Sequence, residues 1–275
     1  MRFLVIGHIT KDLQPHGFTL GGTATYAAIT AQRLGHEVII LTRAEPFVVA
    51  NGLYRGIDVH LLPSATTTTF RNIYQDGHRI QFVSNVAQPI TPKDIPPHLP
   101  KPDIVLLGPI AQEVDPALAE QFPGALVGVV PQGWLREWDE AGRVRPRRWE
   151  EAEPILRAAR VLVLSEEDLG GDQDALQDYV RHTEIVVLTA ASRGCTVFWQ
   201  GTSYAIPPRP ANEVDPTGAG DVFTAAFLIR LRECDDPLEA ARFANVVASF
   251  SVEAPGIHGI PTRDKVERWL AEHVR

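Results

Sequence analysis

Short apolar runs alternate with longer segments of helical periodicity along the chain. The apolar runs are rich in β-branched residues, and most are apolar at every position. They cover residues 3–7, 37–41, 57–62, 103–108, 125–130, 161–165 and 185–189. Strands covered on both faces of a parallel sheet have this composition. The helical segments between them cover residues 22–35, 114–122, 149–159 and 172–182. This alternation predicts a doubly wound α/β fold.

Two segments interrupt the alternation, and each predicts a β-hairpin. Residues 66–85 have two strand-like arms around Asp76-Gly77, a dipeptide typical of hairpin turns. We expect this hairpin to stand outside the main sheet. Residues 195–208 form the second hairpin around Gln200-Gly201, and we expect it at an antiparallel edge of the main sheet. The remaining chain has a helical pattern, over residues 218–232, 237–254 and 262–274.

Length and composition fit one large α/β domain. The chain has 275 residues, of which 44% are hydrophobic, enough for a substantial core. The net charge is −8 and no basic block occurs, which argues against nucleic-acid binding. The densest basic stretch, residues 143–149, is flanked by acids and is expected to be a solvated loop or helix start. Proline-rich residues 92–103 predict an extended connector.

Cysteine usage and the first residues indicate a reducing compartment. Cys195 and Cys234 have no CxxC spacing, and we expect both to be buried as small apolar residues. The opening residues MRFLVIGHIT lack the basic start and long apolar run of a signal peptide. The expected location is therefore the cytoplasm.

Several common catalytic motifs are absent from the sequence. It contains no P-loop, GxSxG, HExxH or EF-hand motif, and no GxGxxG follows the first strand. The missing glycine fingerprint argues against a nicotinamide-dependent dehydrogenase. His8, at the end of the first strand, is expected to be structural rather than catalytic.

The segment EVDPTGAGDVFTAAF, residues 213–227, places three small residues before an acid and an apolar helix. Asp215, Thr217 and Asp221 could serve only to cap that helix. Capping does not require Gly218 and Gly220, and each glycine costs roughly 1 kcal/mol inside a helix. Glycines are useful where backbone amides must approach a bound phosphate. Asp221 would then accept the proton of a hydroxyl that attacks that phosphate, and we favour this interpretation.

The stretch from Asp215 to Asp221 resembles the C-terminal signature of the ribokinase-like, or PfkB, carbohydrate kinases. Gly21-Gly22, opening a helix that ends in Leu34-Gly35, resembles the N-terminal signature of that family. The resemblance covers essentially the whole chain and is closest, in the opening residues, to plant-type myo-inositol kinases. It implies one domain, residues 1–275, with a mainly parallel, helix-flanked sheet and a small β-sheet lid formed by roughly 9–20 and 66–90.

The resemblance also implies the site. Asp221 would be the catalytic base, and the amides of Gly218, Ala219 and Gly220 the anion hole for the transferred phosphoryl group. The substrate-binding positions are Asp12, Gly22 and Tyr26. Residues 188–194 resemble the stretch that contacts the phosphates of ATP, and residues 240–256 the segment beside its adenine. The implied ATP-binding residues are Thr189, Ser192, Gly194 and Asn245. Water-held Mg²⁺ is assigned to Asp168 and Glu166, and a monovalent cation such as K⁺ to Asp215.

Two departures from the family pattern leave alternatives open. Tyr26 stands where the family often has Asn, so the acceptor need not be ribose or fructose. The family's Asn-x-x-Glu motif appears as residues 165–168, Ser-Glu-Glu-Asp, so Mg²⁺ dependence is expected with altered geometry. We expect a kinase for a small sugar or polyol. The alternatives are a kinase for a nucleoside or another alcohol, and a non-catalytic sensor of a sugar or nucleotide.

Some assignments have simpler interpretations. Asp12 could be a surface turn acid, Gly21-Gly22 a tight turn, and residues 189–194 an ordinary strand connection. The tryptophan- and arginine-rich residues 131–149 follow a central strand and are expected to be a surface loop packed by its own aromatics. An arginine from this loop could contact phosphate, but no role is assigned to it. Exposed lid strands could pair two subunits into a homodimer.

Overall fold

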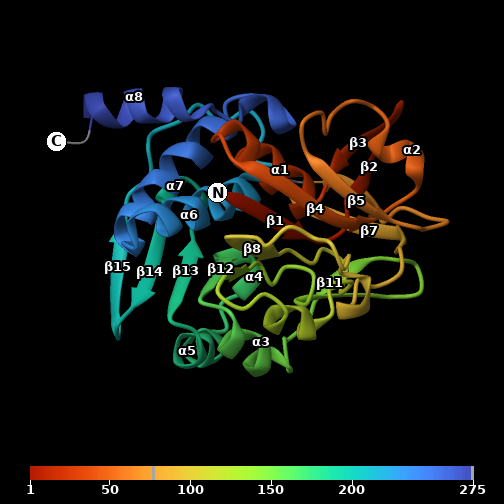
Figure 1. Cartoon of the computed structure of the whole chain (residues 1–275), viewed down its shortest axis with the longest axis horizontal. Coiled ribbons are helices and arrows are strands. Elements are labelled where there is room, and N and C mark those ends of the chain that lie inside the picture. The colour runs from red at the N-terminus through yellow and green to blue at the C-terminus, as the bar shows by residue number, and fades with distance from the viewer. Residues whose placement is uncertain (76–77, 274–275) are drawn as a thin grey trace.

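A nine-stranded sheet forms the centre of the molecule (Figure 1). The computed structural model describes residues 1–75 and 78–273. The strand order is β15-β14-β13-β12-β9-β8-β1-β4-β5, and within the described sheet β14 alone runs antiparallel to the rest. The strands are β1 (Arg2–Ile6), β4 (Glu37–Arg43), β5 (Asp58–Leu62), β8 (Ile104–Leu107), β9 (Leu126–Val129), β12 (Val161–Ser165), β13 (Ile185–Thr189), β14 (Cys195–Trp199) and β15 (Thr202–Ile206).

Helices cover both faces of this sheet. One face carries α1 (Thr23–Arg33), α6 (Ala219–Cys234), α7 (Pro237–Ser251) and α8 (Arg263–His273). The other carries η2 (Pro116–Glu120), α3 (Ala152–Ala158), α4 (Glu166–Leu169) and α5 (Gln173–His182). Successive residues of β1 point to opposite faces of the sheet. Phe3 and Val5 pack in the core under α1, α6 and α7, and Leu4 and Ile6 pack in the core under α3 and α5. The doubly wound fold is therefore confirmed. Within the described residues, no helix combines the length and apolarity needed to cross a bilayer.

Most predicted elements are present with small shifts at their ends. The helix predicted over 114–122 is only the short 3₁₀ helix η2. Asp115 caps it through the amide of Ala117, and Pro123-Gly124 prevents its extension.

The burial predicted for Cys234 is also wrong. Cys195 is buried, but Cys234 is exposed at the last turn of α6, where the helix leaves the core. Four further short helices in the described residues are α2 (Pro46–Val49), η1 (Pro92–Asp94), η3 (Ala191–Arg193) and η4 (Gly256–Gly259).

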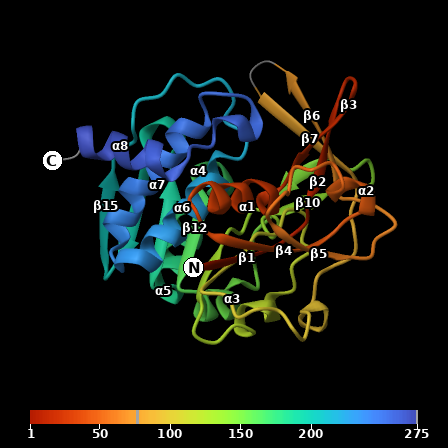
Figure 2. The same ribbon diagram turned by 45° about the horizontal axis from the view of Figure 1, so that its top comes forward.

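A second, four-stranded sheet stands apart from the first (Figure 2). Its order is β3-β2-β6-β7, with β2 (Thr10–Gln14), β3 (Gly17–Gly21), β6 (Thr69–Gln75) and β7 (His78–Asn85). The predicted Asp76-Gly77 turn between β6 and β7 lies outside the described residues. The other predicted hairpin is confirmed, because β14 and β15 form the antiparallel edge of the main sheet. Gln200 and Gly201 between them both have positive φ, at 50° and 73°.

Residues 131–149 are not the surface loop that the sequence suggested. They include a short hairpin of β10 (Arg136–Trp138) and β11 (Val144–Pro146). Trp134 and Trp149 are buried and stacked, with ring centroids 5.0 Å apart, and they pack in the core on the α3 side of the sheet. The indole N–H of Trp134 donates to the carbonyl of Val114 at 3.1 Å. The hairpin is thus anchored firmly at its base.

The strand order reverses at β1. From β1 the chain adds β4 and β5 on one side, and later β8, β9, β12 and β13 on the other. Loops separate at the carboxyl ends of the strands where the order reverses, and ligands of open α/β sheets bind there. The loops after β1 and β8 therefore border the expected site.

A buried carboxylate ties these two loops together. Glu113 accepts hydrogen bonds from the backbone amides of His8, Ile110 and Ala111 at 2.9, 2.9 and 2.7 Å. Such charge-assisted bonds are stronger than neutral ones. The side chain closes the gap between β1 and β8 at the edge where a ligand is expected.

His8 has the structural contacts expected of a lone histidine. Its ring lies in the buried interior, and burial lowers its pKa. Thr68 Oγ1 accepts the amide of Ala87 at 3.0 Å and lies 2.7 Å from His8 Nδ1. The hydroxyl proton of Thr68 therefore goes to Nδ1, and His8 Nε2–H donates to the carbonyl of Gln88 at 3.0 Å. The neutral ring connects β1 to the start of the second sheet.

Replacing the buried acid tests this connection. Glu113→Gln puts an amide NH₂ among backbone donors and removes the charge, so we expect a loss of about 2–3 kcal/mol in the free energy of unfolding. Urea denaturation measures it. The exposed Glu120→Gln on η2 is the control, with an expected change within about 0.5 kcal/mol. Equal stabilities of the two variants would contradict the role given to Glu113.

Candidate functional site

The amino end of α6 lies at the point where the strand order reverses. The helix is almost wholly buried against α1, α7 and the sheet. Gly218 precedes it in the left-handed conformation, and the amide of Ala219 donates to the carbonyl of Pro216 at 3.2 Å. Among the described residues, the amides of Gly218 and Gly220 have no hydrogen-bond acceptor. Two of the three amides predicted to bind an anion are thus available at the positive end of a helix.

The two glycines of this turn are needed for different reasons. A Cβ on Gly218 would lie 2.3 Å from the ring of Tyr26, and its φ of 77° is unfavourable for other residues. A Cβ on Gly220 would meet no atom within 4 Å. Gly218 therefore allows close packing inside the protein, whereas Gly220 leaves open space beside the free amides.

Asp221 occupies the first turn of α6 and is partly exposed. Burial raises its pKa, the neighbouring Thr23 hydroxyl and the positive charge of Arg136 lower it, and the charge of Asp168 raises it, so that the pKa is about 6. Thr23 Oγ1 is buried and has no hydrogen-bond partner among the described residues. A carboxylate with this pKa is ionised at neutral pH, yet takes up a proton more readily than an ordinary Asp.

Tyr26 lies beneath this turn with its ring buried. Burial raises its pKa well above the usual value, and the charges of Asp12, Asp215 and Asp221 raise it further. The carboxylate of Asp12 rests on Gly21, where a Cβ would lie 2.3 Å from Oδ2. Three acids from three separate segments therefore gather around one phenol. The structure brings the predicted residues Asp12, Tyr26 and Asp221 into one site.

Gly22 and Asp215 both serve the packing of this region. Gly22 has a φ of 83°, and a Cβ there would lie 2.5 Å from the carbonyl oxygen of His8. Asp215 accepts the amides of Thr217 and Gly256 at 3.0 and 2.8 Å. Burial alone would raise the pKa of Asp215, but the side chain of Thr217 and the amides of Gly256 and Thr217 hold it below the usual value. Asp215 thus fastens the loop after α7 to the turn before α6.

The predicted ATP-binding residues lie along β13, β14 and α7. Thr189 ends β13, and its hydroxyl donates to Leu164 O at 3.4 Å. Ser192 is exposed in the turn between β13 and β14, whereas Gly194, which ends that turn, is buried. Asn245 is buried on α7, and its side-chain amide donates to the carbonyls of Ile206 and Pro207, both at 3.1 Å. Asn245 therefore holds the segment after β15 in place.

The two acids predicted to organise Mg²⁺ already have protein partners. Asp168 Oδ2 accepts the hydroxyl of Ser165 at 2.7 Å, and Ser165 Oγ accepts the amide of Asp168, which caps α4. Glu166 is paired with Arg193. Across residues 1–75 and 78–273, no cluster of three potential metal ligands occurs. The residues fit a Mg²⁺ ion only if donor phosphates supply most of its ligands.

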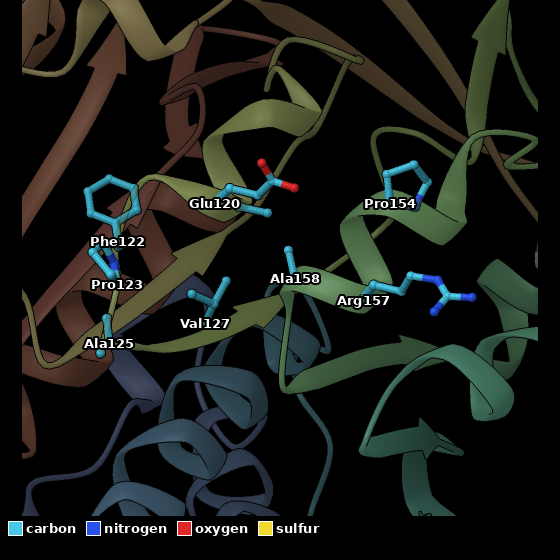
Figure 3. Close-up of a pocket in the computed structure, with 10 residues that line it drawn as sticks. Glu120, Phe122, Pro123, Ala125, Val127, Pro154, Arg157 and Ala158 are labelled. Atoms are coloured by element: carbon cyan, nitrogen blue, oxygen red, sulfur yellow. The ribbon is translucent and has the colours of Figure 1, made fainter.

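A surface pocket elsewhere on the molecule does not belong to this site. It has a volume of about 420 Å³ and lies between η2 and α3, with Glu120, Phe122, Val127 and Arg157 in its wall (Figure 3). It opens on the face of the sheet opposite α6. None of its lining residues is among the predicted site residues.

Comparison with known proteins finds similarity to carbohydrate kinases. The family model described as pfkB family carbohydrate kinase matches residues 145–263. Ribokinase of Bacillus subtilis (strain 168) is 42% identical over 97 residues, which cover 32% of this chain and 33% of that protein. Inositol 3-kinase of Arabidopsis thaliana is 25% identical over 283 residues, which cover 93% of this chain and 75% of the relative.

Solved structures share the whole fold. A pyrophosphate-dependent kinase in the ribokinase family, complexed with a pyrophosphate analog and myo-inositol, superposes with a TM-score of 0.81 at 24% identity, covering 96% of this chain and 99% of that one. Ribokinase from Thermotoga maritima gives a TM-score of 0.76 at 19% identity, covering 98% and 99%. These likenesses confirm the fold predicted from the sequence.

The different surroundings of the two glycines predict different effects on stability. Gly218→Ala introduces left-handed strain and a clash with Tyr26, so we expect a loss of at least about 2 kcal/mol. Gly220→Ala is expected to leave stability unchanged or to raise it by up to about 1 kcal/mol, since alanine favours helix. Denaturant unfolding of both variants checks this, and equal losses would contradict the geometry described.

The raised pKa of Asp221 predicts a stability cost that grows with pH. Between about pH 4 and 6 the native state binds more protons at Asp221 than the unfolded state does, so ionisation destabilises the fold as pH rises. Relative to Asp221→Asn, wild type should lose about 1–3 kcal/mol between pH 4 and 8. Urea unfolding across that range measures it, with the exposed Asp264→Asn as control. Parallel curves for wild type and Asp221→Asn would refute the raised pKa.

Proposed function

Because the chain belongs to the pfkB family of carbohydrate kinases, we propose that it transfers a phosphoryl group from ATP to a hydroxyl of a small sugar or polyol. The observation that carries this proposal is the first turn of α6. There, two free amides, an open space beside Gly220 and the carboxylate of Asp221 lie together. Phosphoryl transfer needs positioned donors and a base of this kind.

In the proposed reaction Asp221 removes the proton of the acceptor hydroxyl as its oxygen attacks phosphorus. The bond from phosphorus to the leaving oxygen of ATP breaks, and ADP departs. The amides of Gly218 and Gly220 bind the oxygens of the group in transfer. Mg²⁺, when bound, neutralises charge on the donor phosphates, and Asp168 is the acid that would hold it through water. A monovalent cation such as K⁺ would bind beside Asp215.

The residues proposed to bind the phosphoryl acceptor favour a polyol of the myo-inositol class as substrate. Asp12 supplies a carboxylate that can accept hydrogen bonds from hydroxyl groups, and Tyr26 replaces the Asn expected in sugar kinases. The inositol 3-kinases of Arabidopsis thaliana and Zea mays align with 93% and 92% of this chain. A nucleoside or another alcohol is the alternative acceptor.

Pyrophosphate is a second candidate donor. Phe250 lies in the segment assigned to adenine, and the guanidinium of Arg209 lies 3.9 Å from its ring centroid and pairs with Glu253 at 2.8 Å. Lys265 Nζ lies 4.1 Å from the same ring centroid. An aromatic ring covered by cations leaves less surface for a base to stack on. A donor without a base needs only the phosphate contacts near α6.

The second sheet is proposed to act as a lid. Lid closure would exclude water and limit hydrolysis of the donor. Leu13 and Phe18 on this sheet are 40% and 41% exposed, and we propose that they contribute to a homodimer. The enzyme would work in the cytoplasm, where ATP is abundant.

A substrate screen tests the function. Wild type is incubated with Mg²⁺, ATP or pyrophosphate, and myo-inositol, ribose, fructose or adenosine, and the product is measured by ³¹P NMR. We expect a phosphorylated polyol. Asp221→Asn should lower kcat at least ~100-fold because the base is lost. Gly220→Ala should lower it strongly with stability retained, because its methyl group occupies the space for the phosphoryl group.

The outcomes separate the alternatives. Saturable ligand binding without any product would identify a sensor and reject the kinase. Full activity of Asp221→Asn would reject Asp221 as base. Asp264→Asn, far from the site on α8, should behave as wild type.

A further inference from the structure

The hairpin of β10 and β11 is held in a fixed position over the loop after β8. The amide of Gly133 donates to Pro109 O at 3.0 Å, and a Cβ on Gly133 would lie 2.5 Å from the amide nitrogen of Ile110. The buried Trp134 anchors the turn from the core side. The start of β10 therefore has little freedom to move relative to the main sheet.

The other end of the hairpin contacts the second sheet. The amide of Val83 in β7 donates to Gly142 O at 2.8 Å, and Phe82 forms an isolated bridge with Arg143. A small apolar cluster fills the space between the hairpin, the second sheet and the loop after β8. It consists of Phe70, Val83, Ile110 and Ala111, with Trp138 and Val144 packed against it. The hairpin therefore links the proposed lid to the main sheet.

Arg136 is the first residue of β10, at the end of the hairpin that contacts the loop after β8. Its guanidinium Nη1 donates to Ile110 O at 3.4 Å, and its side chain is partly buried. Gly108, two residues before Ile110, touches Thr23: a Cβ there would lie 2.3 Å from Thr23 Cγ2. Thr23 lies on α1 three residues before Tyr26, whose ring packs against Gly218 at the start of α6. These contacts place the guanidinium and the carboxylate of Asp221 at the same end of the sheet, across the loop after β8.

The electrostatics agree with this placement. The charge of Arg136 is close enough to Asp221 to lower the pKa of that carboxyl. The other groups that act on Asp221 are Thr23, which also lowers the pKa, and Asp168, which raises it. Arg136 is thus a positive group that acts on Asp221 from outside α6 and α1.

We propose that Arg136 is a catalytic residue whose guanidinium binds oxygens of the phosphoryl group in transfer, on the side opposite the amides of Gly218 and Gly220. This inference rests on the proposed function. A guanidinium can bind two phosphoryl oxygens at once and stays protonated throughout. It gains and loses no proton, since the acceptor proton goes to Asp221 and the electron pair of the breaking bond leaves with the donor. An arginine in this role speeds phosphoryl transfer by roughly 10³–10⁵-fold in known enzymes.

The test compares Arg136→Met, Arg136→Lys and Arg136→Ala with wild type on the best acceptor and donor from the screen. Arg136→Met should lower kcat by at least ~100-fold while KM for the acceptor changes less than ~3-fold, as expected for a contact made in the transition state. Guanidinium ion added at millimolar concentrations should restore part of the activity of Arg136→Ala. The acidic limb of the pH profile should move to higher pH in Arg136→Met, since a positive neighbour of Asp221 is lost.

Arg145→Gln is the matched control, because Arg145 lies exposed on the same hairpin, where it pairs with Asp139 Oδ2 at 2.9 Å. It should keep the activity and pH profile of wild type. Arg136 variants with wild-type kcat, or with a raised acceptor KM and intact kcat, would overturn the proposal. Loss of activity without guanidinium rescue and without a shifted pH profile would assign Arg136 to folding instead. Inactive wild type overturns the proposed function itself, whereas active wild type with unaffected Arg136 variants overturns only this inference.

Discussion

The balance of forces on the carboxylate of Asp221 is the constraint on which the site depends. Burial at the end of α6 disfavours its charge, while Thr23 and Arg136 favour it, and the result is a pKa of about 6. A carboxylate left in water would be a weaker base, and one buried without these partners would be protonated at neutral pH. The rest of the fold serves to hold these groups at fixed distances.

That rigidity comes from contacts between segments far apart in sequence. Tyr26 on α1 packs directly against Gly218, and Asp215 fastens the same turn to the loop after α7. Glu113 ties the loop after β1 to the loop after β8. Each contact fixes the position of one segment that borders the site. The site itself lies where the strand order reverses at β1. The α6 terminus is thereby fixed before any ligand binds, so its amides need little rearrangement to receive an anion.

Local patterns made much of the fold predictable. Uniformly apolar runs identified the parallel strands, and the residues from Gly218 to Asp221 pointed to the site because two glycines in a helical first turn have no structural benefit of their own. The structure gives one of them, Gly218, a packing reason as well, through its contact with Tyr26.

Thr23 and Arg136 were not singled out, because their importance depends on contacts with Gly108 and Ile110, which are distant from them in sequence. Asn245 stays a predicted neighbour of the base, and the sequence did not reveal that its amide donates to carbonyls of the chain after β15. Only the unusual density of tryptophan and arginine in residues 131–149 signalled that this segment mattered.

The most direct measurement of the central claim is the position of a bound anion. Crystals soaked in selenate, an analogue of a phosphoryl group with an anomalous signal, would locate it without knowledge of the natural substrate. The account predicts a selenium peak within hydrogen-bond distance of the amide nitrogens of Gly218 and Gly220, beside Asp221 and facing the guanidinium of Arg136. Selenate bound only elsewhere, with the first turn of α6 empty at saturating concentration, would contradict it.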